Sequence, residues 1–315
     1  TLEKITIPFV GKSKDENGVF GYIFGASSYY YNGDYVPSSL KEVTILDGCE
    51  KIVDHAFYRC NLLTTINIPS SVLVIESYTF SNCDSLIIYC KALSSQNGWD
   101  STWNPNDRPV YYGITSENSF QIDELIYVIQ NDEAVITRYI GDSSTIDIPN
   151  KVQLNDKEYN VSSIGNYAFS KCSSLTSVII PNNIISIGYS AFSNCKALEK
   201  ITIPFVGKSK DENGIFGYIF GTPVYNYNDS YISSSLKEVT ILEGCEKISD
   251  YSFAKCKSLT TINIPSSVQS IGSYAFSNCN SLIIYCKALL SQSGWSSNWN
   301  PDNRPVYYGT TSDNS

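Results

Sequence analysis

The stretch AFYRCNLLTTINIPSSVLVI, residues 56–75, decides the fold of this chain. It returns almost unchanged at residues 252–271, and looser versions begin at Ala168 and Ala191. One leucine per copy recurs every 23 residues within three runs: Leu40, Leu63 and Leu86, then Leu175 and Leu198, then Leu236, Leu259 and Leu282. A fixed period of this length is typical of a solenoid, whose coils bury their apolar faces only by stacking on one another.

Each copy predicts a short strand followed by a return path. Residues 63–68 alternate apolar and polar side chains, as in a strand with one face in the core. Pro69 ends the strand, because proline has no N–H to donate to a neighbouring strand. Val72 and Ile75 are expected to point inward on the return path. Residues 56–60 are expected to form a single helical or 3₁₀ turn on the convex side.

A longer repeat lies above the 23-residue period. Residues 2–119 align with residues 198–315 without a gap, and 30 of the 118 aligned positions differ. Because the copies are so similar, a side chain needed for chemistry should be present in both. This comparison serves as a test for every candidate residue.

Two features interrupt the period in both copies. The first coil has 38 residues instead of 23, because residues are inserted within 11–39 and 207–235. Within the insertion, residues 20–25 are expected to keep the position that Ala-Phe has in other coils. Residues 90–113 form a terminal unit with its own tryptophans, and the next strand is predicted at residues 110–112.

The segment between the two copies belongs to neither pattern. Two apolar runs, at residues 125–129 and 134–137, are separated by Asn131 and Asp132 and predict a β-hairpin. We interpret it as a cap that supplies backbone partners to the open edge of a second array. No such cap precedes Thr1, which falls in the middle of a repeat, so we expect the chain to be a fragment of a longer protein.

The composition disfavours several classes of function. The 315 residues carry a net charge of −9, and only 22 of them are Lys or Arg. Nucleic-acid affinity rests on cations that neutralise phosphates, so we expect no nucleic-acid partner. No apolar run approaches the roughly 20 residues that a transmembrane helix needs, so we expect no membrane insertion of this segment. We expect a monomer.

The ten cysteines follow the repeat and are expected to be small apolar core residues with free thiols. They are Cys49, Cys60, Cys83, Cys90, Cys172, Cys195, Cys245, Cys256, Cys279 and Cys286. Stacked coils lie about 4.8 Å apart, which is close enough for a disulfide, so at least one bond stays an alternative. Parallel Cβ directions would fit the required torsion poorly.

Residues 259–279, LTTINIPSSVQSIGSYAFSNC, carry the pattern Leu-x-x-Ile-x-Ile-Pro-x-x-Val-x-x-Ile-x-x-x-Ala-Phe-x-x-Cys. This pattern resembles the BspA-like leucine-rich repeats, also called the Treponema pallidum type, over nearly the whole chain. The expected fold is a leucine-rich-repeat solenoid. It is a β-rich right-handed superhelix with short parallel strands on the concave face, and turns or short 3₁₀ or α segments on the convex face.

The resemblance also implies a function and a place. Such proteins are surface-exposed or secreted, and adhesion to host matrix proteins or other cells is expected. No catalytic motif, cofactor or metal site comes with the family. The domains are then a first leucine-rich-repeat array without its N-terminal cap at 1–116, a hairpin-type cap and linker at 117–165, and a second array at 166–315, in which 198–315 duplicates 2–119.

The tyrosines of the two insertions are the candidate binding residues, because tyrosine offers contact area at low entropic cost. They are Tyr29, Tyr30, Tyr31 and Tyr35 in the first copy, and Tyr225, Tyr227 and Tyr231 in the second. The alternative is that these rings fold down over their own coil. The insertion is also where the copies differ most, as suits a recognition loop or an unconstrained one.

Other candidates are weaker. His55 is the only histidine and its counterpart is Tyr251, so we expect a surface position beside Phe57 and no catalytic role. Residues 15–18 and 211–214 read Asp-Glu-Asn-Gly but lack EF-hand spacing, so a solvated turn is favoured over a calcium site. Four tryptophans could form a carbohydrate platform, yet their neighbours favour a packed coil; they are Trp99, Trp103, Trp295 and Trp299.

The sequence thus predicts a non-catalytic recognition or adhesion protein. Its partner would be a host matrix or cell-surface protein or a glycan, bound through the concave face and the insertions. A structural stalk that spaces other domains from the cell is the alternative. A polysaccharide-acting enzyme is disfavoured, because no clustered carboxylates recur at inward-facing positions of a cleft.

Overall fold

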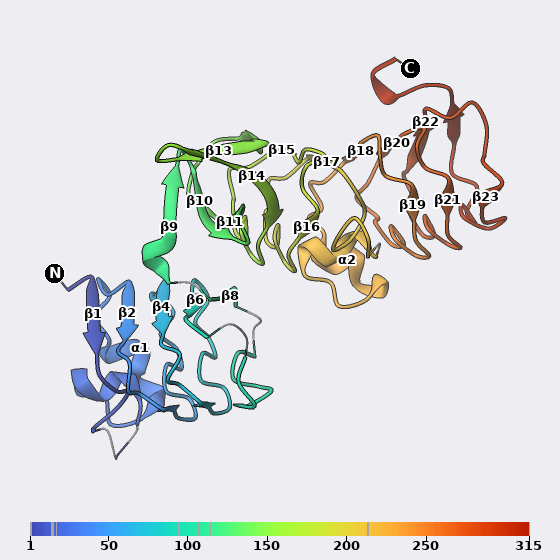
Figure 1. Cartoon of the computed structure of the whole chain (residues 1–315). Helices are drawn as coiled ribbons and strands as arrows, with labels where there is room; N and C mark the ends of the chain where they lie inside the picture. The colour runs from blue at the N-terminus through green and yellow to red at the C-terminus, as the bar shows by residue number, and fades with distance from the viewer. Residues whose placement is uncertain are drawn as a thin grey trace. The chain divides into compact units, whose positions relative to one another are not determined.

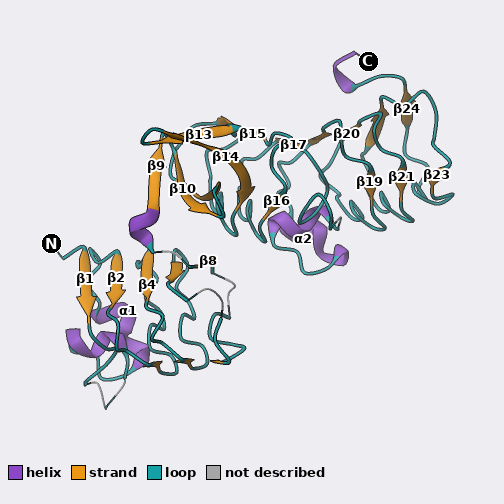
Figure 2. Ribbon diagram, viewed as in Figure 1, coloured by secondary structure: helices purple, strands orange, loops and turns teal. Residues whose placement is uncertain are grey.

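The computed structural model describes residues 2–13, 16, 18–92, 95–105, 108–113, 115–212 and 214–314. The chain divides into two compact units, Thr1–Ser119 (unit 1) and Phe120–Ser315 (unit 2). Stacked coils of parallel β-structure form a solenoid in each unit, with few helices (Figures 1 and 2). The expected leucine-rich-repeat solenoid is confirmed.

Unit 1 contains one main sheet and one return sheet, and both are parallel. The main sheet has the order β1 (Lys4–Ile7), β2 (Glu42–Ile45), β4 (Thr65–Ile68), β6 (Ile87–Cys90) and β8 (Val110–Tyr112). The return sheet consists of β3 (Lys51–Ile52), β5 (Val74–Ile75) and β7 (Gly98–Trp99). Glu42 pairs with Thr65, 23 positions later, so the sequence period is the register of the sheet. The strand predicted at residues 110–112 is confirmed.

Unit 2 repeats this arrangement after a cap. Its main sheet has the order β12 (Thr145–Asp147), β15 (Ser177–Ile179), β17 (Lys200–Ile203), β18 (Glu238–Ile241), β20 (Thr261–Ile264), β22 (Ile283–Cys286) and β24 (Val306–Tyr308). The return path carries β16 (Ser186–Ile187), followed by the sheet of β19 (Lys247–Ile248), β21 (Ser270–Ile271) and β23 (Gly294–Trp295).

The cap of unit 2 contains two hairpins. The predicted one is confirmed, because β10 (Leu125–Gln130) pairs antiparallel with β11 (Glu133–Tyr139). The other joins β13 (Lys151–Leu154) to β14 (Lys157–Ile164), and the sequence analysis missed it. β14 also pairs parallel with β11 and β16, so it connects the cap to the return path. β9 (Ser119–Ile122) forms the outer edge of this sheet.

The turn at residues 56–60 differs from the expected helical or 3₁₀ turn. Backbone N–H groups alternate between two kinds of acceptor: the Phe57 N–H donates to Thr79 of the next coil (3.0 Å), whereas the Tyr58 N–H donates to His55 within its own coil (3.0 Å). The alternation needs left-handed backbone at His55 (φ 55°) and Arg59 (φ 61°). The predicted single helical or 3₁₀ turn is thus present only as separate hydrogen-bonded turns, because neighbouring coils accept the alternate N–H groups.

Regular helical segments occur in the insertions and after the last main-sheet strand of each unit. In the insertions they are the 3₁₀ helices η1 (Phe20–Phe24) and η2 (Tyr29–Tyr31) and the α-helix α1 (Asn32–Tyr35) in unit 1, and η4 (Phe216–Phe220), η5 (Tyr225–Tyr227) and α2 (Asn228–Tyr231) in unit 2. The 3₁₀ helices η3 (Ser116–Asn118) and η6 (Ser312–Asn314) follow the main sheets. Phe20 stacks on Phe57 at 4.9 Å, and Phe57 stacks on Phe80 at 5.3 Å. Phe20 thus continues the phenylalanine column of the coils, as predicted.

Thiols and indoles fill the remaining core. All ten cysteines are free, and all except Cys172 are buried. Burial raises the pKa of the Cys83 and Cys279 thiols to about 12, so they stay protonated and unreactive. The indole of Trp99 donates to the Val72 carbonyl at 3.1 Å, and Trp295 donates in the same way to Val268 at 3.2 Å. Trp99, Trp103 and Trp295 are buried and Trp299 is half-buried against the core, which confirms the packed-coil interpretation.

Candidate functional site

The insertion of unit 1 is held to the coil below it by one buried amide. The Asn32 side chain accepts the Gly21 N–H at 2.9 Å and donates to the Ala56 carbonyl at 3.1 Å. A Cβ at Gly21 would lie 2.4 Å from the Asn32 oxygen, so the close approach requires glycine there. Asn32 thereby fixes α1, which carries Tyr35, relative to η1.

Unit 2 uses the equivalent asparagine in a slightly different way. Asn228 is fully buried and donates to the Ala254 carbonyl at 2.7 Å. A Cβ at Gly217 would lie 2.1 Å from the Asn228 oxygen, so the same tight approach is present. The Asp229 carboxylate on α2 forms an ion pair with Lys257 at 2.6 Å, and this partner lowers the pKa of Asp229. Gly33 and Asn61 stand at these positions in unit 1, so the ion pair is specific to unit 2.

The first candidate tyrosine of each insertion lies in a column of aromatic rings beside the turns. In unit 1, Tyr29 lies against His55 with ring centroids 4.4 Å apart, and His55 lies 5.5 Å from Tyr78. In unit 2, Tyr225 stacks on Tyr251 at 4.3 Å, and Tyr251 stacks on Tyr274 at 5.3 Å.

His55 therefore belongs to this aromatic column, and the sequence analysis missed the column itself. The signal was present, since aromatic residues stand two positions before the repeat phenylalanine in five coils: His55, Tyr78, Tyr167, Tyr251 and Tyr274. The Nδ1 atom of His55 lies 2.7 Å from the Asp54 carboxylate. Its half-buried ring is positioned by packing against Tyr29 and Tyr78.

The other candidate tyrosines are exposed. Tyr30 stacks on Tyr29 at 4.3 Å with 55% of its surface accessible, and a hydrogen bond to Tyr30 raises the pKa of Tyr29. Tyr31 and Tyr35 form an edge-to-face pair with centroids 6.4 Å apart. About half of the surface of each remains accessible, as is also the case for Tyr227 and Tyr231 in unit 2. The insertions thus divide into rings that pack and rings that face solvent.

The strand face, the outward side of the main sheet, is crossed by a short segment that follows the last strand of each unit. We call residues 115–118 of unit 1 and 311–314 of unit 2 the strap. Asn67 of β4 exchanges two hydrogen bonds with Ser116, and Asn263 of β20 does the same with Ser312. The middle of this face is therefore occupied by the protein's own chain.

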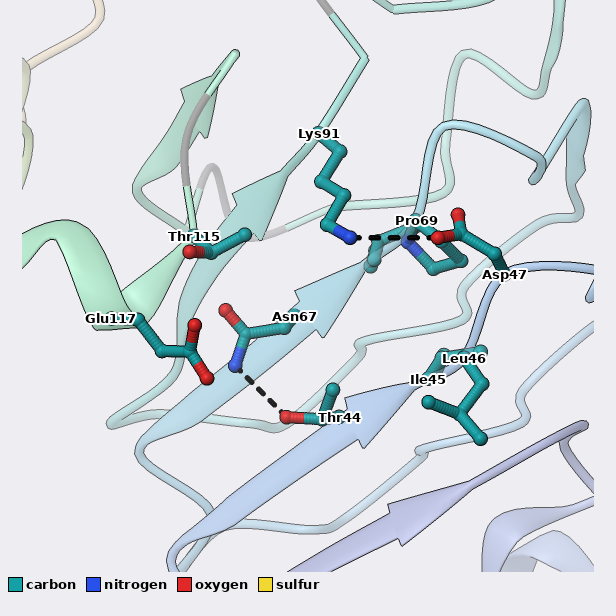
Figure 3. Close-up of a pocket in the computed structure, with 10 residues that line it drawn as sticks. Thr44, Ile45, Leu46, Asp47, Asn67, Pro69, Lys91, Thr115 and Glu117 are labelled. Carbon is teal, nitrogen blue, oxygen red and sulfur yellow. Dashed lines mark hydrogen bonds and ion pairs between the residues drawn. The ribbon is translucent and has the colours of Figure 1, made fainter.

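A small cavity of about 110 Å³ lies beside the strap in unit 1 (Figure 3). Glu117 of the strap and Asn67 of β4 line it, and the Asn67 amide donates to Thr44 at 3.2 Å. Lys91 and Asp47 point toward each other across one end, with charged atoms 3.5 Å apart. The cavity is smaller than the 300–1,000 Å³ typical of ligand pockets.

Metal-binding candidates lead to no site in the described part of the chain. Among the described residues, no group of three or more His, Cys, Asp or Glu side chains could hold a metal ion. Asp15, Asn17 and Asn213 of the possible calcium loops lie outside the described residues. Glu16 and Glu212 of the same loops form ion pairs with Lys12 (3.0 Å) and Lys208 (2.8 Å).

The repeat pattern can now be compared with known families. A family model described as a BspA-type leucine-rich repeat region matches in six copies, at residues 31–95, 143–219 and 226–292. The chain belongs to this family. The matches cover more than half of the sequence, and they confirm the resemblance predicted from residues 259–279. Membership of the BspA-type leucine-rich repeat family suggests a protein-interaction role.

This BspA-type chain is also similar to solved structures, among them the following three. A leucine-rich cell surface protein from Faecalibacterium prausnitzii is 24% identical, with a TM-score of 0.44, and the match covers 90% of this chain and 76% of that one. The pneumococcal vaccine antigen PcpA is 16% identical (TM-score 0.42; 87% and 78% covered). A Treponema pallidum leucine-rich repeat protein is 23% identical (TM-score 0.33; 53% and 70% covered). No curated protein matches significantly.

No helix among the described residues has the length and apolar character that crossing a membrane requires.

Proposed function

We propose that this protein is a non-catalytic recognition protein of the cell surface or extracellular space. It binds a host matrix or cell-surface protein or glycan through the exposed tyrosines of its two insertions. Family membership supports an interaction role, and the insertions are where the repeat departs from what a coil needs for packing.

One comparison carries the proposal. Between residues 26–37 and residues 222–233, eight of the twelve aligned positions differ. The four positions that are identical between the copies are, in the numbering of the first copy, Tyr29, Tyr31, Asn32 and Tyr35. Asn32 is retained because it is buried and hydrogen-bonded, and Tyr29 because it stacks in the aromatic column.

Packing does not explain why Tyr31 and Tyr35 are identical in the two copies. Tyr31 and Tyr35 are 49% exposed, and their counterparts Tyr227 and Tyr231 are 52% and 47% exposed. An exposed ring that survives in a segment where most neighbours have changed is the expected signature of a contact residue. Tyrosine is enriched at interfaces because it presents a large amphipathic surface with few rotatable bonds.

Three alternatives are less well supported: a passive stalk, binding mainly through the strand face, and a polysaccharide-acting enzyme. A passive stalk would need the coils but not the exposed rings. The strand face is a secondary contact surface, since the strap already occupies its middle. A polysaccharide-acting enzyme would need a recurring pair of carboxylates. The recurring strand-face carboxylates Glu42 and Glu238 are held in ion pairs with Lys4 (2.8 Å) and Lys200 (2.9 Å).

Replacing the exposed rings without disturbing the coil tests the proposal. The double variant Tyr31→Ser with Tyr227→Ser should lower adhesion to immobilised matrix proteins and cultured host cells by at least about tenfold, as expected for loss of a hot-spot aromatic. Tyr307→Ser, at a 51% exposed ring of β24, is the matched control and should adhere normally. Undiminished adhesion of the double variant, with an unchanged melting temperature, would favour the stalk.

A further inference from the structure

Unit 2 contains a pocket of about 380 Å³ between α2 and the preceding coil. The rings of Phe192 and Phe220 lie beneath its floor with centroids 6.5 Å apart, and they are fully buried, with 0% and 2% of their surface exposed. The accessible apolar ring is that of Tyr231 of α2, which lines one wall. The volume falls within the range of small-molecule sites.

The wall and mouth of this pocket are polar. Asn194, Ser230 and Ser234 line it and offer amide and hydroxyl groups that can both donate and accept hydrogen bonds. Ser233 closes one side, because its hydroxyl donates to the Lys196 carbonyl at 3.2 Å and joins the segment after α2 to the coil. Apolar ring surface beside hydroxyl and amide groups suits a ligand that has both a C–H face and hydroxyls, as a pyranose ring does.

The local charge is positive although the chain as a whole carries −9. Lys196 lines the pocket, and its ammonium group forms no ion pair within the described part of the chain. The Asp229 carboxylate, which also lines the pocket, is neutralised by Lys257 at 2.6 Å. Lys255 adds a further positive charge that favours the ionised form of Asp229. An anionic group on the ligand would therefore complete the pairing at Lys196.

We propose that this pocket binds a carboxylated sugar residue of a glycan, such as a hexuronate, with its ring on Tyr231 and its carboxylate on Lys196. The inference rests on the proposed recognition function and names a ligand class for one of its two insertions.

Binding of two methyl glycosides to the full chain tests this proposal. Methyl β-D-glucuronide should bind with a dissociation constant of about 1 mM, a normal value for a ligand of this size. Methyl β-D-glucoside, which lacks the carboxylate, should bind about tenfold more weakly. Saturation-transfer NMR and calorimetry provide the measurement. Equal affinity for the two glycosides, or no binding of the glucuronide, would overturn the assignment.

Matched variants locate the site. Lys196→Gln should remove the preference for the glucuronide, whereas Lys210→Gln, at another exposed lysine of unit 2, should retain it. Tyr231→Ala should weaken both glycosides, and Tyr307→Ala should weaken neither. A short glutamate-rich peptide is the competing probe. If it binds more tightly than the glucuronide and loses that affinity in Lys196→Gln, the pocket recognises acidic peptides and the sugar assignment is wrong.

The same preparations separate this proposal from the adhesion function. If Tyr31→Ser with Tyr227→Ser abolishes adhesion but the glucuronide does not bind, the pocket assignment alone fails. If the glucuronide binds through Lys196 but adhesion is indifferent to the tyrosines, the insertion-based function fails and the pocket assignment stands.

Discussion

Asn67 and Ser116 exchange two hydrogen bonds although they lie 49 residues apart. The Asn67 amide donates to the Ser116 hydroxyl at 2.8 Å, and the Ser116 N–H donates to the Asn67 side-chain oxygen at 2.7 Å. Asn263 and Ser312 repeat both bonds at 2.9 Å. The outward middle position of these strands, β4 and β20, thus holds a strap across the strand face in each unit.

Releasing the strap should be local and selective. Asn67→Ala removes both bonds, each of net value about 1 kcal/mol, so amide exchange of the Ser116–Asn118 segment should accelerate by about tenfold or more. The strap of unit 2 provides the internal control in the same molecule, and Asn263→Ala should give the reverse pattern. Hydrogen-exchange mass spectrometry measures both straps at once. Equal acceleration in the two straps would show that the effect is global unfolding and not a released contact.

The position of His55 should accept tyrosine but reject valine. His55 has φ 55°, and Tyr251 occupies the equivalent site of unit 2 with φ 56°. His55→Tyr should therefore be neutral or slightly stabilising, since it recreates the tyrosine column of unit 2. His55→Val should cost roughly 1–2 kcal/mol from left-handed backbone strain alone. Urea denaturation of the two variants gives the comparison, and equal midpoints would contradict the argument from backbone strain.

The repeat in the sequence was enough to predict the coils but not the contacts that close them. Residues such as Leu63, Ile66 and Phe57 recur because every coil must be filled, so their spacing determines the strand register and the core. Even the irregular coil was predictable, because Phe20 fills the position of a repeat phenylalanine.

Features that depend on contacts between distant positions were not predictable in this way. The partner of Asn67 lies 49 residues away, and nothing local to Asn67 indicates it. The hairpin of β13 and β14 was missed because its strands are polar, although Asn155 and Asp156 between them are typical turn residues. Among the candidate tyrosines, the sequence could not separate Tyr29, which packs, from Tyr31, which is exposed, because that depends on the path of η2.

Thiol reactivity should single out one cysteine. Cys172 is half-buried, and a hydrogen bond with the Cys195 thiol lowers its pKa. The other nine are buried, and for Cys90 and Cys286 burial raises the pKa to about 12. Brief treatment of the native protein with iodoacetamide at pH 8 should therefore alkylate Cys172 first, as read by peptide mass spectrometry. Denatured protein is the control, in which all ten should react. Early modification of Cys83 or Cys279 would contradict the burial of these two thiols.

The Asp229–Lys257 ion pair should make a small, pH-dependent contribution that unit 1 lacks. Its partner holds the pKa of Asp229 below the usual value of about 3.9, so the stabilisation is fully present above that value. It is lost as the pH falls through the lower pKa of the folded state. Because Lys257 is 54% exposed, solvent screening limits the contribution to under about 1 kcal/mol.

Lys257→Asn, which installs the residue found at Asn61 of unit 1, should raise the pKa of Asp229 toward its ordinary value. Carbon-detected NMR titration of the Asp229 carboxyl measures the shift directly. The difference in unfolding free energy between this variant and the natural chain should shrink as the solution is acidified below about pH 4, because the Asp229 carboxyl then becomes protonated in both proteins. Lys210→Gln should leave the titration unchanged. An Asp229 titration curve that is the same with and without Lys257 would show that the 2.6 Å contact does not control the charge at the mouth of the unit 2 pocket.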